Sequence, residues 1–225
     1  MNTLTKPLLI DYFNSLSMSY SVNEFASFYL TNYMRRKLIN KINNFNGKSV
    51  LDLMSGRGEN LKYINNKSTK VTTIDFSYKM NIAAKLKQNN TNLLQIEDDF
   101  FNTNCKPKSF DIIVCSFGIK TINNNNLKEF SQKLNRLIKP NGEILFLEMV
   151  KPRNRFNYKF IKFYLDILLP KLFGNKFKLL FPYLNNHISM TPLKTNMINE
   201  NLNIIEHKRY FDFFEIIHAK KEIVI

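Results

Sequence analysis

Short apolar runs alternate with helix-forming segments along most of this chain of 225 residues. Such alternation predicts an α/β fold with a mostly parallel sheet, doubly wound so that helices cover both faces. Ligands of such sheets bind at the carboxyl ends of the strands. The predicted strands are residues 50–53, 71–74, 92–96, 109–117, a stretch ending at 147, and two final strands near 202–210 and 215–220.

The sharpest local feature is a Gly-x-Gly pair, Gly56 and Gly58, which closely follows the first predicted strand and its acid Asp52. Glycines let the backbone turn tightly and let a ligand come close. Asp75 ends the second predicted strand, where a carboxylate would meet the ribose of a nucleoside. Leu61 occupies the place of the third glycine that a dinucleotide site requires. S-adenosylmethionine, which has no phosphate, is therefore the favoured cofactor.

Five motifs, in order, resemble those of class I S-adenosylmethionine-dependent methyltransferases, which have a Rossmann-like fold. They are Asp-x-x-x-Gly-x-Gly at 52–58, Asp-Phe-Ser-x-x-Met at 75–80, Asp-Asp-Phe at 98–100, the strand ending at 116–117, and Leu-Ile-Lys-Pro-Asn-Gly at 137–142. The resemblance implies that the acid at 98–99 accepts a hydrogen bond from the adenine and that the next residue packs on its ring. The cofactor-binding candidates are Asp52, Met54, Ser55, Gly56, Gly58, Asp75, Phe76, Met80, Asp98, Asp99, Phe100, Ser116 and Phe117, and no metal ligand is predicted.

Within that superfamily, the chain resembles the ubiquinone/menaquinone-biosynthesis C-methyltransferase family over nearly its whole length. Residues 33–36, Tyr-Met-Arg-Arg, are similar to the family's Trp-Arg-Arg, and residues 116–121 to its Ser-Phe-Gly-Leu-Arg-Asn. Residues 183–188 are similar to its Tyr-Leu-x-x-Ser-Ile. Lys120 stands where that family has Arg, and His187 where it has Ser. The resemblance thus implies a retained cofactor site and a rebuilt acceptor site.

The two departures are also the candidate catalytic residues. Methyl transfer from a sulfonium is an in-line displacement, in which the protein positions, desolvates and tunes the acceptor. A phenolic acceptor is activated by a base or by a cation that stabilises its oxyanion. Lys120 is the candidate cation and His187 the candidate base, although both residue types are also common on surfaces. Candidate acceptor-lining residues, for which core packing is the alternative, are Tyr20, Tyr33, Tyr164 and Tyr183.

The expected function is methyl transfer from S-adenosylmethionine to a small aromatic, quinone-like or polyketide-like acceptor, by C- or O-methylation. Two alternatives stay open: a nucleic-acid methyltransferase, and a methyltransferase-fold protein whose cofactor is structural or supports a cyclisation. The chain lacks the Asn/Asp-Pro-Pro-aromatic and Pro-Cys motifs of nucleic-acid methyltransferases. Its expected organisation is one domain, residues 1–225, with an N-terminal helical cover at 1–44, a cofactor-binding core at 45–149, a helical insertion or lid at 150–200 and final strands at 201–225.

The chain is strongly basic, with 33 Lys and Arg residues against 18 acidic ones and a net charge of +15. Its lysines are spread widely in an Asn- and Ile-rich sequence, which favours compositional drift over a polyanionic partner. We therefore expect no nucleic-acid partner, and a homodimer stays open. Cys105 and Cys115 follow neither a disulfide nor a metal pattern. No run approaches the ~20 apolar residues of a membrane span, and no secretory signal is visible, so a cytoplasmic location is expected.

Basic and aromatic residues alternate most densely at 151–178, where Asp166 is the single acid. Phe160, Phe163, Tyr164 and Ile167 recur there at helical spacing and form an apolar face. Two interpretations follow. The helix covers the core and keeps a solvated basic side, or it is a lid over the acceptor pocket that contacts anionic lipid.

Overall fold

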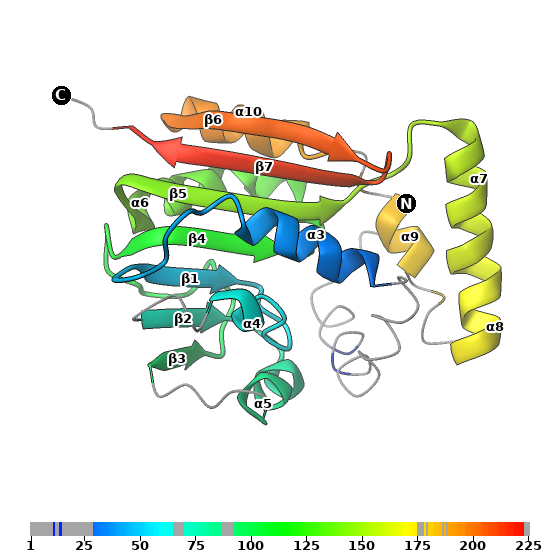
Figure 1. Ribbon diagram of the computed structural model, residues 1–225, viewed down its shortest axis with the longest axis horizontal. Coiled ribbons are helices and arrows are strands. Elements are labelled where there is room, and N and C mark those ends of the chain that lie inside the picture. The colour runs from blue at the N-terminus through cyan, green and yellow to red at the C-terminus, as the bar shows by residue number, and fades with distance from the viewer. Residues whose placement is uncertain are drawn as a thin grey trace.

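The computed structural model describes residues 11, 14, 29–64, 70–86, 92–174, 178, 180–185, 187 and 189–222. Within them, one sheet has the strand order β3-β2-β1-β4-β5-β7-β6 (Figure 1). Strands β1 to β5 run parallel, whereas β7 is antiparallel to both of its neighbours. The strands are β1 (Ser49–Leu53), β2 (Lys70–Ile74), β3 (Leu93–Ile96), β4 (Phe110–Ser116), β5 (Ile138–Met149), β6 (Leu202–Tyr210) and β7 (Phe214–Lys221).

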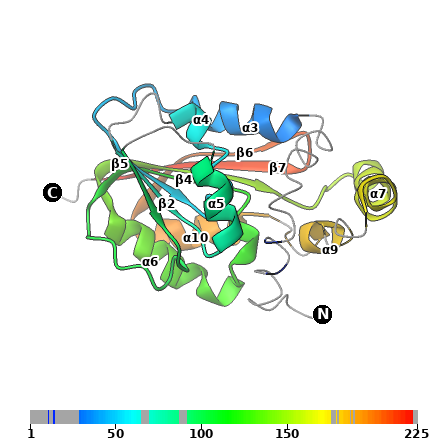
Figure 2. The ribbon, with the colours of Figure 1, turned by 90° about the horizontal axis from the view of Figure 1, so that it is seen from below.

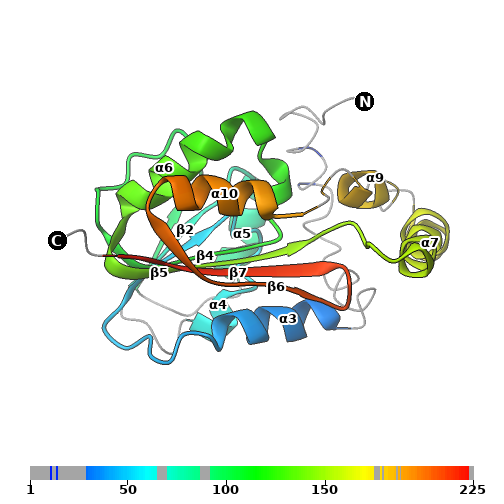
Figure 3. The same ribbon diagram turned by 90° about the horizontal axis from the view of Figure 1, so that it is seen from above.

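Helices cover both faces of the sheet (Figures 2 and 3). On one face lie α3 (Leu30–Ile39) and α4 (Leu61–Ile64), and on the other α6 (Leu127–Leu137) and α10 (Thr191–Asn199). The remaining α-helices of the described chain are α5 (Tyr78–Leu86), α7 (Arg155–Phe163), α8 (Leu169–Phe173) and α9 (Leu180–Asn185). The predicted doubly wound, mostly parallel sheet is therefore confirmed.

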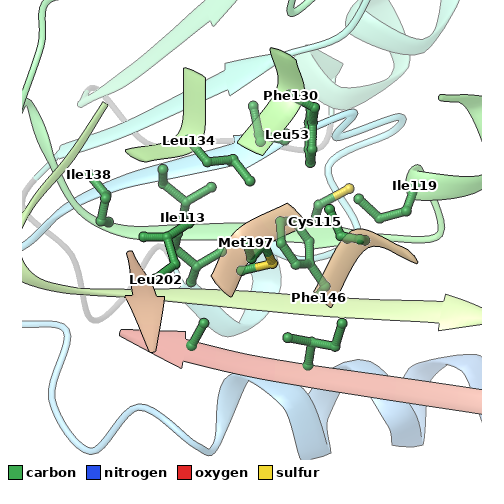
Figure 4. Packing of buried hydrophobic residues seen from close by; sticks show 14 of the residues in the cluster. Leu53, Ile113, Cys115, Ile119, Phe130, Leu134, Ile138, Phe146, Met197 and Leu202 are labelled. Carbon is green, nitrogen blue, oxygen red and sulfur yellow. The ribbon is translucent and has the colours of Figure 1, made fainter. Parts of the chain in front are cut away.

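Two apolar layers follow from the alternation of side chains along the strands. Leu53 and Phe146 face α6 and α10, in the cluster that Figure 4 shows from close by. Val50 and Leu147 face α3 and α4. By the same alternation, Asp52 lies on the α3 side of the sheet and Glu148 on the α10 side. The polar residues at the carboxyl ends of the strands are thus divided between the two faces.

The predicted elements near the two ends of the chain can be compared with the structure to different extents. Helix α3 lies within the predicted N-terminal cover at residues 1–44, most of whose earlier part lies outside the described residues. The last two strands agree with the prediction within about one residue. A short 3₁₀ turn (Ile119–Thr121) follows β4 and a second one (Asn124–Asn126) precedes α6.

In the helical insertion, the side that faces the core is not the apolar face that the sequence indicated. α7 continues through a π turn (Tyr164–Leu168) into α8. Its inward residues are Ile161, Leu165 and Leu169, which pack against α9. Three of the four residues of the predicted apolar face are exposed, namely Phe160, Phe163 and Ile167. Of the two interpretations of that face, the one in which it covers the core is therefore wrong.

Candidate functional site at the carboxyl edge of the sheet

The turn after β1 is built from left-handed backbone. Gly56 has φ +54° and Gly58 φ +70°, a conformation that glycine adopts without steric cost. A Cβ on Gly58 would come within 2.7 Å of Leu61 Cδ1, whereas a Cβ on Gly56 would meet nothing within 4 Å. Gly58 is thus required for packing, and Gly56 leaves open space beside the backbone at the strand end.

Asp75 closes this turn from the end of β2. The Gly56 N–H donates to Asp75 Oδ2 at 2.8 Å, and the Ser77 N–H donates to Oδ1 at 2.8 Å. Burial raises the pKa of this carboxyl, and the two backbone hydrogen bonds oppose that rise. A carboxylate accepts about four hydrogen bonds, so Asp75 keeps capacity for the hydroxyls of a ribose.

A second carboxylate, Asp52, lies fully buried on the α3 side. Asn60 Nδ2 donates to Asp52 Oδ1 at 2.8 Å, and Ser116 Oγ donates to Asn60 Oδ1 at 3.0 Å. Burial raises the pKa of Asp52 to about 7, against the lowering effects of Asn60 and Arg35. Asp52 Oδ2 has no hydrogen-bond partner among the described residues. A buried acceptor without a donor is costly, and an amino group of a bound nucleoside cofactor is a donor that fits it.

The remaining cofactor candidates follow the same strand ends. Two of them, Phe100 and Met80, are buried in the core. Ser55 and Phe76 follow β1 and β2, and Asp98 and Asp99 follow β3, where the Phe101 N–H donates to Asp99 Oδ1 at 3.0 Å. Phe100 is buried and packs edge-on against Phe130, with centroids 5.2 Å apart. Met80 is buried among residues of the helical insertion and α9. The roles of these side chains toward a cofactor stay predictions.

The residues that follow β1 and β4 have strained backbone and pack against each other. Met54 has φ 50° and Phe117 φ 66°, and neither is glycine. A Cβ on Gly118 would lie 2.6 Å from both Met54 Cβ and Met54 Sδ, and 2.9 Å from Cys115 Sγ. Non-glycine residues in this conformation cost about 1–3 kcal/mol each and gather at functional sites. The two strand ends therefore fix each other's position beside the glycine turn.

Arg35 is a component of this edge that the motifs did not single out as a site residue. Its guanidinium carbon lies 4.8 Å from the centroid of the Phe117 ring, and the side chain is buried. Phe117 in turn packs edge-on against Phe214, with centroids 6.1 Å apart. Arg35 lowers the pKa of Asp52. Helix α3 thus supplies a buried positive charge to the strand ends, and the Arg-Arg pair in the sequence was the available signal.

Lys120, the candidate cation, forms a buried ion pair. Its Nζ lies 2.6 Å from Glu148 Oε1, with the Lys120 side chain 10% exposed and that of Glu148 0%. The Lys120 N–H donates to Glu148 Oε2 at 3.1 Å, and the Met149 N–H donates to Oε1 at 2.7 Å. The ammonium also lies 5.6 Å from the centroid of the Phe117 ring. Glu148, which sequence reasoning missed, therefore holds Lys120 in place at the end of β5.

His187, the candidate base, shares the electrostatic environment of that ion pair. Burial lowers the pKa of His187, Glu148 raises it and Lys120 lowers it again. Its backbone carbonyl accepts a hydrogen bond from the Lys151 N–H at 2.8 Å. Its Nε2 has no hydrogen-bond partner in the described part of the chain. The side chain lines a small hollow together with Ile119, Ile122, Asn124, Leu127, Ser189, Met190, Pro192 and Leu193.

Another buried carboxylate, Glu215, anchors the segment that carries His187. Arg209 donates to Glu215 Oε1 from Nη2 at 2.6 Å, and the Met190 N–H donates to Oε2 at 2.6 Å. His207 Nε2 lies 3.2 Å from Oε2, and Ser189 Oγ contacts both oxygens. These contacts lower the pKa of Glu215 to about 2 despite its burial. Nothing in the sequence pattern of β6 and β7 singled out this cluster.

Of the four candidate acceptor-lining tyrosines, the structure describes the side chains of Tyr33 and Tyr164, which lie on different elements. Tyr33 on α3 is 53% exposed and meets Phe211 edge-on, with centroids 6.3 Å apart. Tyr164 lies half-buried in the π turn, where burial raises its pKa. Tyr183 lies in α9, and its side chain is outside the described part. Tyr20 lies outside the described residues. Their acceptor-lining role stays a prediction.

Metal and membrane features are absent from the described part of the chain. No group of three or more His, Cys, Asp or Glu side chains there could hold a metal ion. No described helix has the length and apolarity needed to cross a membrane. The residues that do converge at the strand ends are suited to a nucleoside-type ligand, and Lys120 lies close enough to His187 to lower its pKa.

Comparisons with known proteins identify a family for the chain and known structures with the same fold. The model of the ubiE/COQ5 methyltransferase family matches residues 2–208. A demethylmenaquinone methyltransferase of Chlamydia felis is 28% identical over 198 residues, which are 84% of each chain. A ubiquinone/menaquinone biosynthesis C-methyltransferase, UbiE, of Wigglesworthia glossinidia brevipalpis is 28% identical over 176 residues, 75% of this chain and 69% of that one. A crystal structure of a SAM-dependent methyltransferase from Aquifex aeolicus superposes with a TM-score of 0.61 at 16% identity, over 83% of this chain and 88% of that one.

Proposed function

From the premise that the chain belongs to the ubiE/COQ5 methyltransferase family, and is an S-adenosylmethionine-dependent methyltransferase, we propose that its acceptor is a small aromatic, quinone-like or polyketide-like molecule. We propose C- or O-methylation of a hydroxylated ring. The relatives are named a demethylmenaquinone methyltransferase and a ubiquinone/menaquinone biosynthesis C-methyltransferase, and both names support a ring acceptor. A cytoplasmic location is part of the proposal, in keeping with the free thiols of Cys105 and Cys115.

The cofactor, when bound, supplies an electrophilic methyl group and a leaving group. The residues that would hold it are Asp52, Gly56 and Asp75, because they offer an unpartnered buried acceptor, an open backbone turn and a carboxylate at the strand end. The protein's own task is then to orient the acceptor, exclude water and adjust its charge.

One observation carries the proposal for the acceptor. A neutral imidazole, His187, and a fixed ammonium, Lys120, lie in one buried environment at the carboxyl edge. His187 is in its base form at neutral pH because burial lowers its pKa, and its Nε2 has no partner among the described residues. In our proposal His187 removes the proton of a ring hydroxyl and Lys120 stabilises the resulting oxyanion. A hydroxylated ring uses both groups.

The test is a screen for methyl transfer. The protein is incubated with methyl-labelled S-adenosylmethionine and a panel of phenols, naphthols and hydroxyindoles, with aliphatic alcohols and short nucleic acids as comparison acceptors. The proposal expects label in at least one hydroxylated ring and none in the comparison acceptors. Label only in nucleic acid would contradict it. Tight cofactor binding without any transfer, together with ring closure of a polyene acceptor, would favour a cofactor-supported cyclisation instead.

A further inference from the structure

Helix α7 and the π turn after it are apolar on two opposite sides. The inward side, with Ile161 and Leu165, packs in a cluster with Phe181 and Leu184 of α9. The outer face, as we call it, consists of four side chains at spacings of four, three and four residues, each more than half exposed: Phe156, Phe160, Phe163 and Ile167. A helix that is apolar all round is normally buried. The outer face therefore lacks the polar cover of an ordinary surface helix.

Positive charge surrounds the outer face. Five exposed basic residues lie on the same helical segment or just before it, whereas Asp166 is the single acid between residues 151 and 178. A negatively charged partner is complementary to this surface. A second copy of the chain, which carries a net charge of +15, is not. The exposed basic residues are Arg153, Arg155, Lys159, Lys162 and Lys171.

The segment is held firmly at its start. Asn154 Oδ1 caps α7 by accepting from the Phe156 N–H at 2.8 Å and from the Asn157 N–H at 3.2 Å. Asp212, in the turn between β6 and β7, accepts from the Arg153 and Asn154 N–H groups at 3.2 and 3.0 Å. The outer face is thus presented by an anchored helix, and its exposure is a property of the fold.

The position of α7 suits contact with an extended surface. It lies at the margin of the molecule in all three ribbon views, beyond the carboxyl ends of the parallel strands (Figures 1, 2 and 3). A planar partner touching α7 would meet the molecule at the end that carries Lys120 and Asp75. Phenylalanine and isoleucine enter the boundary between headgroups and acyl chains, while Lys and Arg beside them stay at the charged headgroups.

We propose that the outer face of α7 binds the surface of an anionic lipid bilayer, with the helix lying in the interface plane. Electrostatic attraction contributes about fivefold in partitioning for each basic residue near the surface. Insertion of the phenylalanine rings adds an apolar contribution that salt does not screen. Binding should therefore need both anionic lipid and the outer face.

The first experiment is co-sedimentation of the full chain with vesicles of phosphatidylcholine mixed with phosphatidylglycerol, and with vesicles of phosphatidylcholine alone. The double variant F160Q/F163Q should lose at least about tenfold in partitioning to anionic vesicles. The matched control L86Q/I198Q replaces two apolar helix residues on α5 and α10, each also more than half exposed, and should bind as the parent does. K159Q/K162Q should lose about twenty-five-fold, and K85Q/K128Q, which replaces lysines on α5 and α6, much less.

The second experiment uses the absence of tryptophan from the sequence. Phe160→Trp creates a single fluorescent reporter on the outer face, and Ile198→Trp a matched one on α10. Anionic vesicles should shift the emission of the first reporter to the blue, and brominated lipid should quench it, with neither effect on the second.

Three results would overturn the proposal. One is equal binding to both kinds of vesicle by the parent and F160Q/F163Q. Another is the absence of any blue shift for Phe160→Trp. The third is that the parent does not bind vesicles and forms a dimer in sedimentation velocity, whereas F160Q/F163Q is a monomer. The occupant of the outer face would then be a second copy of the chain. None of these readouts depends on methyl transfer, so they separate this proposal from the proposed function.

Discussion

Glu148 on β5 lies directly opposite Glu215 on β7, and both side chains are buried on the α10 side of the sheet. Two opposed carboxylates destabilise a sheet unless each is compensated. Lys120 compensates Glu148, and Arg209 with His207 compensates Glu215. The two ion pairs also fix different parts of the site, because one holds the candidate cation and the other the segment that carries His187.

Glu215→Gln should lower the free energy of unfolding by about 3 kcal/mol at pH 7. The contacts around Glu215 lower its pKa from 4.5 to about 2. The stabilisation from a lowered carboxyl pKa is complete above 4.5 and is lost as pH falls toward 2, so the difference between parent and variant should narrow across that range. Urea unfolding at several pH values measures it. Glu143→Gln, on β5 and bonded to His218, is a partly exposed control with an expected cost below about 1 kcal/mol. Equal costs for the two variants at all pH values would contradict the assignment.

Asp75→Ala should weaken cofactor binding while the protein stays folded. Removal of the carboxylate eliminates the hydrogen bonds available to a ribose and releases the Gly56 and Ser77 N–H groups. We expect the dissociation constant for S-adenosylhomocysteine to rise by roughly thirtyfold, about 2 kcal/mol. Isothermal titration calorimetry measures it.

The control for that experiment is Asp111→Ala. Asp111 also accepts a backbone N–H bond, from Ser49 at 2.8 Å, but it lies near the start of β4. Its loss should lower stability and leave cofactor affinity unchanged. An equal loss of affinity in both variants would mean that Asp75 acts only through general stability.

The positions of the strands could be predicted from the sequence because buried parallel strands are apolar runs bounded by turns. The glycine turn was readable for a related reason, since left-handed backbone restricts residue choice at Gly56 and Gly58. Met54 shows the limit of that reasoning. It occupies a left-handed position beside Gly118, and only the packed structure shows that one side chain fills the space that the glycine leaves.

Most of the site features that could not be predicted depend on how strands far apart in the sequence pair with one another. The opposition of Glu148 and Glu215 depends on how β7 pairs with β5, and the Arg209 contact depends in addition on the pairing of β6. Helical periodicity identified an apolar stripe at residues 160–167 but could not say which of two apolar sides faces the core. The motif predicts that Phe100 packs on the adenine ring, which stays a prediction, but it did not indicate that the Phe100 ring also packs edge-on against Phe130.

Lys120→Met should reduce turnover about a hundredfold, as expected for loss of a group that stabilises developing negative charge. The dissociation constant of the cofactor should stay within about twofold, because Lys120 serves the acceptor. The variant also leaves Glu148 buried without its cation, at a cost in stability of about 3 kcal/mol. Activity must therefore be measured well below the melting temperature.

Two further variants separate catalysis from stability at Lys120. Lys120→Met/Glu148→Gln removes both charges, so it should regain much of the lost stability while turnover stays low. Lys139→Met breaks an ion pair of similar length, 2.7 Å to Asp111, in a more exposed place. It should keep full turnover. If the double variant recovered activity along with stability, Lys120 would have only a structural role.

His187→Gln should remove the acidic limb of the turnover profile. Burial lowers the pKa of His187 from 6.5, so the imidazole stays neutral at pH 7 and takes up a proton only at lower pH. Turnover that depends on its base form should therefore be constant near neutrality and fall below pH 6.5. The variant should show a lower rate, by roughly a hundredfold, that no longer depends on pH in that range.

Stability gives an independent check on the same group. The unfolded chain binds the proton of His187 more tightly than the folded chain does, so the free energy of unfolding should rise with pH from the lowered pKa up to 6.5. His187→Gln should flatten that rise. His218→Gln, at the other end of the sheet beside Glu143, is the matched control and should leave the turnover profile unchanged. If His187→Gln kept the parent's acidic limb in turnover, the base would be another group, and the acceptor would rely on Lys120 and positioning alone.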